Sequence, residues 1–363
     1  MTQLRTVQVL GGGSAGSSAH VRSLAAGLVA RGVRVTVCAP ADVERTYDFS
    51  GSGAHHVAVP RRGDPASVAT LRAACAGADV VHAHGVHAAV RTAIALGGQR
   101  IPLVVTLHTR ARTEGPRGHL VRLLERRAVR AAAIVLGTSS DLVDRARSRG
   151  ARDARLAPAA LPAAPRWTGG PESKARAELG AVERPLLMAV GSLGPEQGYD
   201  TLLDAAQAWS CLDPAPLLAI AGEGRERGGL QRRIDTGGLP VRLIGRRDDI
   251  TELLAAADIA LLTSRWEARS VLAQEALRLG VPLIATAVGG IPELVGDAAE
   301  LVPYGDAKAL GDAVVRLLAD PGRRQWLAEA GRAQAETWPT EDETIAQVLC
   351  VYDELAQPPA RSR

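Results

Sequence analysis

Short apolar runs alternate with helix-like patterns along the whole chain, and this alternation begins twice. Strands are expected in the first half at residues 7–10, 33–37, 57–59, 79–82, 103–107 and 133–136. Strands are expected in the second half at residues 186–190, 217–221, 241–244, 259–262, 283–285 and 300–302. Such alternation is typical of a parallel sheet covered by helices on both faces. We therefore predict an α/β chain with two Rossmann-like, doubly wound parallel-sheet domains.

The two domains are expected to be joined by residues 158–171, which are rich in Pro, Ala and Gly. We assign residues 1–163 to the first domain and 171–338 to the second, with a helix at 341–356 that crosses back to the first domain and a disordered tail at 357–363. Doubly wound sheets bind ligands at the carboxyl ends of their strands. The ligand site is therefore expected in a cleft between the domains.

The net charge of +4 hides an asymmetry between the two halves. Residues 1–165 hold 22 Arg and Lys against 10 Asp and Glu, and the remaining residues hold 43 − 22 = 21 against 39 − 10 = 29. The first half is therefore expected to face an anionic partner. Nucleic acid is a poor candidate, because the chain has a single Phe and no aromatic residues interleave its basic stretch.

The four cysteines are far apart and form no metal-binding spacing, which predicts buried single thiols in a reducing compartment. No apolar run approaches the ~18 residues of a membrane span, and the N-terminus does not resemble a secretory signal. A cytoplasmic location is expected.

A glycine-rich turn, GGGSAG at residues 11–16, follows the first predicted strand and matches the dinucleotide fingerprint G-x-G-x-x-G. An NAD(P)-dependent oxidoreductase is one interpretation, but the acidic residue that the fingerprint needs after the second strand is displaced beyond Pro40, to Asp42. A tight turn without a ligand is another. We favour a third, in which the glycines form a floor close to the phosphates of a sugar donor.

Two glutamates in the segment 263–295 give a sharper signal. Glu267 follows a predicted strand, and Glu275 lies eight residues later, inside the next helix. Carboxylates accept paired hydrogen bonds from vicinal hydroxyls, so each glutamate could hold one sugar ring. The helix that begins at Ser270 and Val271 directs free N–H groups and its dipole at an anion between them. The alternative is an exposed helix with ordinary surface glutamates.

Taken together, the sequence resembles the retaining glycosyltransferases of family 4, which have the two-domain GT-B fold. The resemblance rests on GGGSAGSSAHV, VVHAHG, VTLHT, GEG, LIGRRDDI, the E-x7-E pair and GVPLIATAVGGIPELV. It implies a nucleotide-diphosphate sugar as co-substrate, no cofactor, no metal, and transfer with retention of configuration. In such a reaction the departing phosphate helps to deprotonate the acceptor, so no protein base is named.

The resemblance also implies roles for individual residues. Glu267 would contact the hydroxyls of the donor sugar, Glu275 the ribose of the nucleotide, and His108 the region beside the reacting carbon. Gly12 and Gly13 would close on the donor phosphates.

The chain departs from this family in the turn after the first strand of the second domain. The family pattern G-R-L-x-x-x-K-G supplies an Arg and a Lys to the diphosphate, whereas Ser192 and Gln197 occupy those places here. Ala268-Arg269-Ser270 also replaces the usual Gly-Phe-Gly. Three outcomes are open: Arg269, Arg246 or Arg247 supplies the charge, the enzyme is slow, or the chain is a catalytically impaired homologue with a binding or regulatory role.

The acceptor side is expected in the first domain. We place His20 and Thr109 there, together with a basic stripe at helical spacing, Arg122, Arg126 and Arg130, whose helix carries Leu120 and Leu124 on its other face. The stripe would meet a phosphorylated or lipid-linked acceptor, or the anionic inner leaflet of the membrane. The alternative is a solvated helix face. For His82 and His84 we favour packing at a strand end over metal binding, because no third ligand is evident in the sequence.

Overall fold

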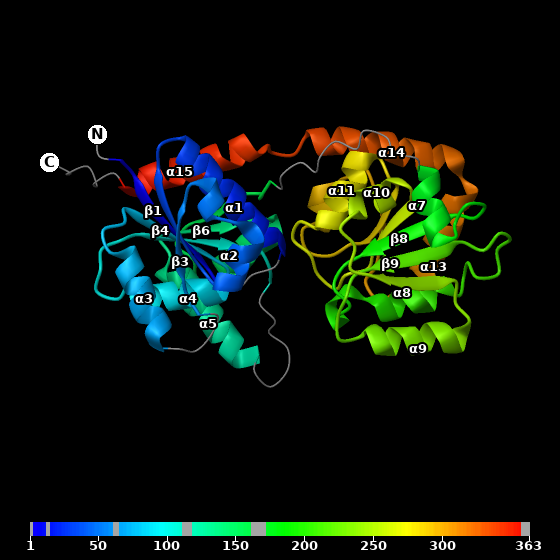
Figure 1. Cartoon of the computed structure of the whole chain (residues 1–363), viewed down its shortest axis with the longest axis horizontal. Coiled ribbons are helices and arrows are strands. Elements are labelled where there is room, and N and C mark those ends of the chain that lie inside the picture. Colours follow the sequence, from blue (N-terminus) through cyan, green and yellow to red (C-terminus); the bar gives the residue numbers. More distant parts are fainter. Residues whose placement is uncertain (1–2, 12–14, 61–64, 111–117, 161–171, 357–363) are drawn as a thin grey trace. The chain divides into compact units, whose positions relative to one another are not determined.

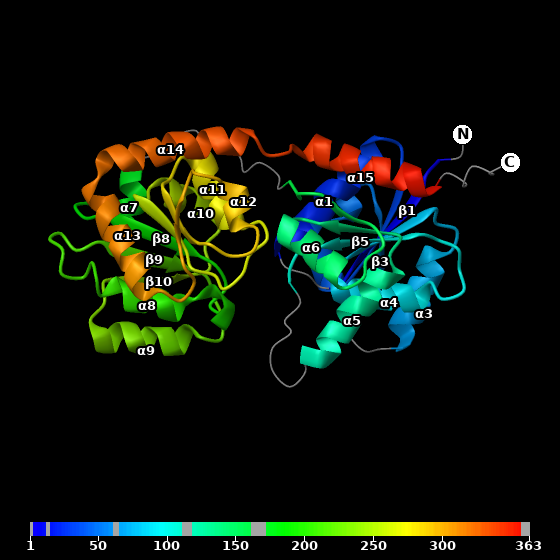
Figure 2. The same ribbon diagram turned by 180° about the vertical axis from the view of Figure 1, so that it is seen from behind.

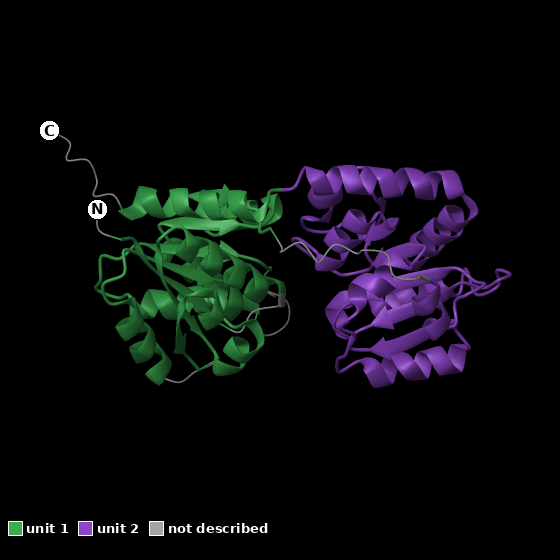
Figure 3. Ribbon diagram, turned by 45° about the horizontal axis from the view of Figure 1, so that its top comes forward, with its two compact units in different colours: residues 1–162, 339–363 green, residues 163–338 purple. Residues whose placement is uncertain are grey.

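The computed structural model describes residues 3–11, 15–60, 65–110, 118–160 and 172–356. The chain divides into two compact units, Met1–Pro162 with Pro339–Arg363, and Ala163–Trp338 (Figure 3). Gly12, Gly13 and the predicted tail at 357–363 lie outside the described residues. The units are called unit 1 and unit 2 below.

In the described part of unit 1, seven parallel strands form one sheet in the order β3-β2-β1-β4-β5-β6-β7 (Figure 1). The strands are β1 Arg5–Leu10, β2 Arg34–Ala39, β3 His55–Ala58, β4 Val80–His84, β5 Leu103–Leu107, β6 Ile134–Gly137 and β7 Ala154–Leu156. The helices are α1 Ala15–Ala30, α2 Ala41–Tyr47, α3 Pro65–Cys75, α4 Val86–Ala95, α5 Gly118–Ala131, α6 Ser140–Ser148 and α15 Glu341–Ala356. The strand order reverses between β1 and β4, and this switch point is where doubly wound sheets place ligands.

The described part of unit 2 holds a second parallel sheet, of six strands in the order β10-β9-β8-β11-β12-β13. The strands are β8 Leu186–Val190, β9 Leu217–Ala221, β10 Val241–Gly245, β11 Ile259–Leu262, β12 Leu283–Thr286 and β13 Glu300–Val302. The helices are α7 Glu172–Leu179, α8 Tyr199–Ala206, α9 Arg227–Gly237, α10 Ile250–Ala255, α11 Val271–Leu279, α12 Ile291–Val295, α13 Ala307–Ala319 and α14 Pro321–Glu336. Here the order reverses between β8 and β11.

Helices cover both faces of each sheet, which explains the continuous apolar runs. Every residue of β4, β5, β9 and β11 is buried, as expected for parallel strands covered on two sides. Figures 1 and 2 show α1 and α15 together over one face of the unit 1 sheet, with α3, α4 and α5 over the other. The predicted α/β class and the two doubly wound sheets are confirmed.

Helix α15 completes the core of unit 1 although it follows unit 2 in the sequence. Ile345, Val348, Val351 and Tyr352 are buried in the same cluster as residues of α1 and β2. Gly27 on α1 permits the close approach, because a Cβ there would collide with Ile345. The contact therefore depends on a glycine in the middle of a helix.

The expectation of buried thiols was wrong for two of the four cysteines. Cys38 and Cys75 are buried thiols whose pKa values burial raises to about 12 and about 11, but Cys211 and Cys350 are exposed.

Strand β7 was missed because it is a three-residue edge strand without an apolar run. Among the described helices, none is both long enough and apolar enough to cross a bilayer.

Candidate active site

Unit 2 brings two segments together at its switch point: the β8 turn, residues 191–198, and the β11 loop, residues 263–270. The Thr263 hydroxyl donates to the Gln197 carbonyl at 2.7 Å, and the Ser264 hydroxyl donates to Gln197 Oε1 at 3.3 Å. The Arg265 amide donates to the Glu196 carbonyl at 2.8 Å. Gly198 has φ +68°, and a Cβ there would collide with the Thr263 carbonyl. The turn and the loop are therefore packed as one surface.

Glu267 lies in the β11 loop, held on a second side by the segment before α12. The Gly290 amide donates to the Glu267 carbonyl at 2.9 Å. Gly289 adopts φ +54°, and a Cβ there would collide with that same carbonyl oxygen. Burial raises the pKa of the Glu267 carboxyl, and a hydrogen bond from Ser264 partly opposes the shift. The carboxyl is thus desolvated in a rigid loop, the environment in which a hydrogen bond from a ligand hydroxyl is strongest.

The N-terminus of α11 begins immediately after this loop. Ser270 is the N-cap, and its hydroxyl accepts from the Ala273 amide at 3.4 Å. Glu275 lies about one turn into the helix, with a side chain that is 14% exposed and 3.3 Å from the Arg278 guanidinium. Both glutamates therefore belong to the same end of the unit 2 sheet, together with Val271 in the exposed first turn of α11.

Two of the three arginines expected to supply charge to the diphosphate have other contacts. The Arg269 guanidinium lies 5.8 Å from the ring centroid of Trp338, and its Nε and Nη2 atoms are buried without a hydrogen-bond partner among the described residues. Burial lowers the pKa of Arg269 to about 10. Arg247 is bound by Asp249, at 2.8 and 2.6 Å, and by Glu178 at 2.6 Å. Ser192 and Arg246 are exposed.

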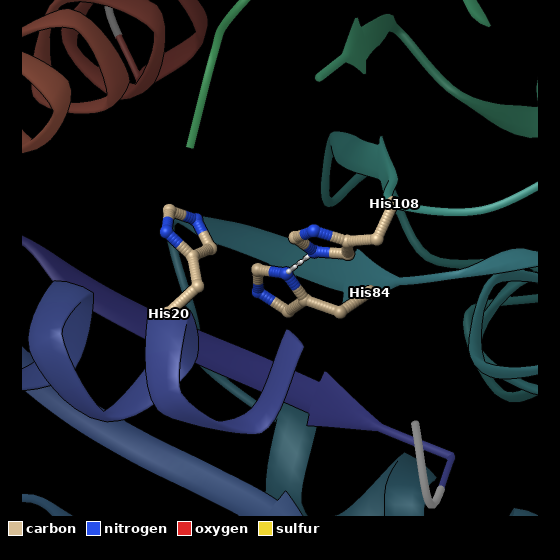
Figure 4. Close-up of side chains that lie close together, drawn as sticks. All are labelled: His20, His84 and His108. Carbon is tan, nitrogen blue, oxygen red and sulfur yellow. Dashed lines mark hydrogen bonds between the residues drawn. The ribbon is translucent and has the colours of Figure 1, made fainter. Parts of the chain in front are cut away.

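In unit 1, three histidines from different elements meet beside the switch point of the sheet (Figure 4). His20 comes from α1, His84 ends β4, and His108 follows β5. His84 Nδ1 lies 3.2 Å from His108 Nε2, and the His20 and His108 ring centroids are 5.3 Å apart. Burial lowers the pKa of all three, that of His20 to about 4, so the rings are neutral at pH 7. The sequence analysis expected His84 to pack at a strand end with no third ligand nearby, so its contact with His20 and His108 was missed.

A buried polar network continues behind these histidines. His84 Nε2 lies 3.0 Å from Gln8 Oε1, and Gln8 Nε2 donates to the Tyr352 hydroxyl at 2.9 Å. His82 joins it through Nδ1, 2.6 Å from the Tyr352 hydroxyl, and Nε2, 2.6 Å from the Thr106 hydroxyl. Sequence reasoning missed Gln8 and Tyr352. The available signal was an amide side chain, Gln8, between two valines in the strand RTVQVL.

The histidine group is also the candidate metal site of the described residues, since one nitrogen from each of His20, His84 and His108 lies within 4.8 Å of the others. Neutral imidazoles suit zinc or copper. However, the His84 and His108 rings are inclined by only 25° with centroids 5.4 Å apart, so they meet end to end across the 3.2 Å contact. That is the geometry of an N–H···N hydrogen bond rather than of two lone pairs converging on an ion.

The predicted basic stripe lies on α5, where Arg122, Arg126 and Arg130 are exposed. Leu120 was expected on an opposite apolar face, but it is 55% exposed and Leu123 is 60% exposed. The buried side of the helix carries Ala128 and Val129 together with Glu125, whose side chain is 2% exposed and receives Arg145 at 2.5 Å and Arg149 at 2.9 Å. The exposed side of α5 therefore presents arginines and leucines together. Thr109 is exposed after β5.

Each unit matches the model of a different glycosyl transferase domain. Residues 15–161 match the model of the glycosyl transferase 4-like domain, and residues 172–334 match that of glycosyl transferases group 1. Each unit is therefore similar to a glycosyltransferase domain. Among solved structures, Anabaena HepE in complex with UDP is similar over 97% of this chain and 100% of its own, with a TM-score of 0.81 and 22% identity. The fold is therefore the GT-B fold.

Curated relatives extend the similarity to named transferases. The chain is 34% identical over 195 residues to a GDP-mannose-dependent monoacylated alpha-(1-6)-phosphatidylinositol monomannoside mannosyltransferase of Corynebacterium glutamicum, covering 49% of this chain and 51% of the relative. It is 31% identical over 253 residues to the alpha-D-kanosaminyltransferase of Streptomyces kanamyceticus, covering 63% and 64%. The chain thus spans less than two thirds of either relative's length. The oxidoreductase interpretation receives no support from these comparisons.

Proposed function

We propose that this chain is a glycosyltransferase that moves a sugar from a nucleotide-diphosphate sugar to an acceptor, with retention of configuration and without a metal ion. Both domain families and the named relatives support sugar transfer from an activated donor. The observation that carries the proposal is the end of the unit 2 sheet, where Glu267, Glu275 and the N-terminus of α11 lie around one switch point.

Each of these groups has a stated task in the proposed reaction. Glu267 accepts hydrogen bonds from hydroxyls of the donor sugar, and Glu275 from the ribose. The first N–H groups of α11 and the backbone of the β8 turn bind the diphosphate. His108 contacts the sugar beside the reacting carbon. The departing phosphate takes the proton of the acceptor hydroxyl on the same face of the sugar, which gives retention.

Purified protein incubated with a panel of nucleotide sugars, UDP-glucose and GDP-mannose included, tests the proposal through release of nucleoside diphosphate. Glu267→Gln should lower kcat by about 10²- to 10³-fold, because a contact to the reacting sugar is lost, whereas Glu275→Gln should mainly raise KM for the donor. Glu252→Gln, on the exposed face of α10, is the matched control. Turnover that survives both active-site changes would contradict the assignment, and strict dependence on a divalent ion would contradict a metal-free reaction.

The proposed acceptor is anionic, phosphorylated or lipid-linked, and binds in unit 1. One support is the similarity to the phosphatidylinositol monomannoside mannosyltransferase of Corynebacterium glutamicum. The other is the α5 surface, where exposed arginines lie beside exposed leucines. This combination suits peripheral contact with an anionic membrane. His20 and Thr109 are proposed acceptor contacts.

Sedimentation with liposomes tests the membrane contact. Binding to vesicles with anionic lipid should exceed binding to neutral vesicles and should fall when Arg122, Arg126 and Arg130 are changed to Gln. The control carries the same three changes at exposed arginines elsewhere in unit 1: Arg22, Arg34 and Arg45. Equal partitioning of all proteins between the two vesicle types at low salt would refute the contact.

A catalytically impaired homologue with a binding or regulatory role is the second candidate. The replaced cations at Ser192 and Gln197 favour it, as do the contacts of Arg247 and Arg269 described above. The two candidates predict different results for the variant Ser192→Arg/Gln197→Lys: a slow enzyme should gain turnover, whereas an impaired homologue should stay inactive.

A further inference from the structure

A continuous chain of hydrogen bonds runs from His108 into the core of unit 1. It passes from His108 Nε2 to His84 Nδ1, from His84 Nε2 to Gln8 Oε1, and from Gln8 Nε2 to the Tyr352 hydroxyl. It ends through both nitrogens of His82 at Thr106. All three rings are neutral at pH 7, because burial lowers their pKa values, that of His82 to about 3. Each ring therefore carries one N–H.

The amide of Gln8 determines where these hydrogens lie. Its Oε1 can only accept, so His84 must carry its hydrogen on Nε2 and leave Nδ1 as a lone pair. The 3.2 Å contact to that lone pair then requires His108 to carry its hydrogen on Nε2. On the other side, Gln8 Nε2 donates to the Tyr352 oxygen, so the Tyr352 hydroxyl hydrogen is free to point at His82 Nδ1.

We propose that Gln8 and Tyr352 are positioning residues that hold His108 in its Nε2–H tautomer, so that His108 Nδ1 stays an acceptor for a substrate hydroxyl. With the Gln8 amide oriented as described, the hydrogen-bond chain runs in one direction, from His108 to Thr106, and α15 supplies the acceptor for the Gln8 NH₂ group. The contact with a substrate hydroxyl rests on the proposed function, whereas the tautomer itself does not.

Tyr352 matters because a glutamine side chain can turn over. With its amide reversed, Gln8 would donate to His84 Nε2, His84 would carry its hydrogen on Nδ1, and His108 would be pushed to the Nδ1–H form. In the described arrangement the Tyr352 oxygen accepts from Gln8 while its hydrogen is used by His82. The Tyr352 hydroxyl can also donate to a reversed amide, so both orientations are paired while it is present. Once it is removed, the described orientation leaves the Gln8 NH₂ group buried without an acceptor, whereas a reversed amide still donates to His84 Nε2, so the loss favours reversal.

The two tautomers of His108 differ at Nδ1, the nitrogen proposed to contact the substrate hydroxyl. The Nε2–H form presents a lone pair on Nδ1, which accepts from a hydroxyl. The Nδ1–H form presents a donor there. The change Tyr352→Phe preserves the ring that packs in the core and removes only the hydroxyl.

Two-bond ¹H–¹⁵N correlation spectra of protein with ¹⁵N-labelled histidine test the proposal at pH 7.5, since they distinguish the two neutral tautomers. In the unmodified protein His82, His84 and His108 should all show the Nε2–H pattern. Tyr352→Phe should convert His84 and His108 partly or fully to Nδ1–H. The control is Tyr304→Phe, at a tyrosine that is 43% exposed in unit 2, and it should leave the spectrum unchanged.

An Nδ1–H pattern for His108 in the unmodified protein would overturn the proposal even if no variant folds. An unchanged His108 pattern in folded Tyr352→Phe would overturn the role of Tyr352. In an active enzyme, Tyr352→Phe should lower kcat about tenfold or more at a temperature well below its melting temperature, which the loss of two buried hydrogen bonds should itself lower. Because the spectra need no turnover, failure of the proposed function leaves this test intact.

Discussion

Adding the two cations that the family pattern predicts in the β8 turn is the most informative change that this chain offers. The double variant Ser192→Arg/Gln197→Lys places two positive charges in this turn. Ser192 is exposed, so an arginine there should cost below about 0.5 kcal/mol of stability. Gln197 loses its 3.3 Å hydrogen bond from Ser264, worth about 1 kcal/mol. The domain should therefore stay folded, and any change in rate can be assigned to charge.

The expected gain comes from the diphosphate that leaves in the transition state. One well-placed donor at developing negative charge is worth about 10²- to 10³-fold in kcat, or about 2.7–4 kcal/mol. Two cations in one site do not add fully, so we expect a gain of about 10²- to 10³-fold for the double variant. The Gln197→Lys change should also lower the raised pKa of Glu267, since a cation beside a carboxyl favours the charged form.

The assay is release of nucleoside diphosphate from a panel of nucleotide sugars, with donor affinity measured separately. Ser210→Arg/Gln207→Lys adds the same charges at exposed positions after the far end of α8 and should leave the rate unchanged. If the unmodified protein already turns over at ordinary rates and the double variant gains nothing, the inferred defect is wrong. A folded double variant that stays inactive would favour the impaired homologue.

Three further changes test the geometry. Glu125→Gln leaves the partly buried guanidinium groups of Arg145 and Arg149 without their carboxylate, so denaturant unfolding should show a loss of about 3 kcal/mol. Asp144→Asn, in an exposed pair, should lose below about 1 kcal/mol. As the pH drops from 6.5 towards the lowered pKa values, the free energy of unfolding should fall by up to about 1.4 kcal/mol per pH unit for each neutral buried histidine, because the unfolded chain takes up protons first. A free energy of unfolding that stays constant between pH 6.5 and 5 would contradict the burial of these histidines. Gly289→Ala should abolish donor binding in a nucleotide titration, because its Cβ would collide with the Glu267 carbonyl oxygen. The control Gly305→Ala, at φ +79° with free space around it, should lose about 1 kcal/mol of stability and still bind the nucleotide.

The sequence predicted the sheets well because burial on both faces makes strands visible as apolar runs. Strands β5, β8, β9, β11 and β13 begin and end where the runs do. Strand β7 escaped detection since three residues at a sheet edge leave no periodic signal. Helix α9 escaped as well, because RGGLQRRIDTG has only two buried apolar residues, Leu230 and Ile234.

The candidate site was predictable where it is local and not where it depends on tertiary packing. The spacing of Glu267 and Glu275 could be read directly, because both lie on one strand–loop–helix unit. The hydrogen-bond chain behind His108 joins β1, β4, β5 and α15, with Gln8 and Tyr352 separated by 344 positions. Spacing along the chain carries no trace of such a contact. Arg269 likewise could not be placed, since its position depends on Trp338 beyond α14.

The return of α15 to unit 1 has a consequence for synthesis on the ribosome. Unit 2 is contiguous in the sequence, whereas the hydrophobic cluster of unit 1 stays open until Ile345 and Tyr352 emerge. At ordinary elongation rates, making Ala163–Trp338 takes roughly 10–35 s. During that interval the apolar residues of unit 1 that α15 covers stay exposed, so the half made first is completed last. A premature stop shortly before α15 would leave a folded second domain attached to an incompletely folded first domain, which chaperones would bind.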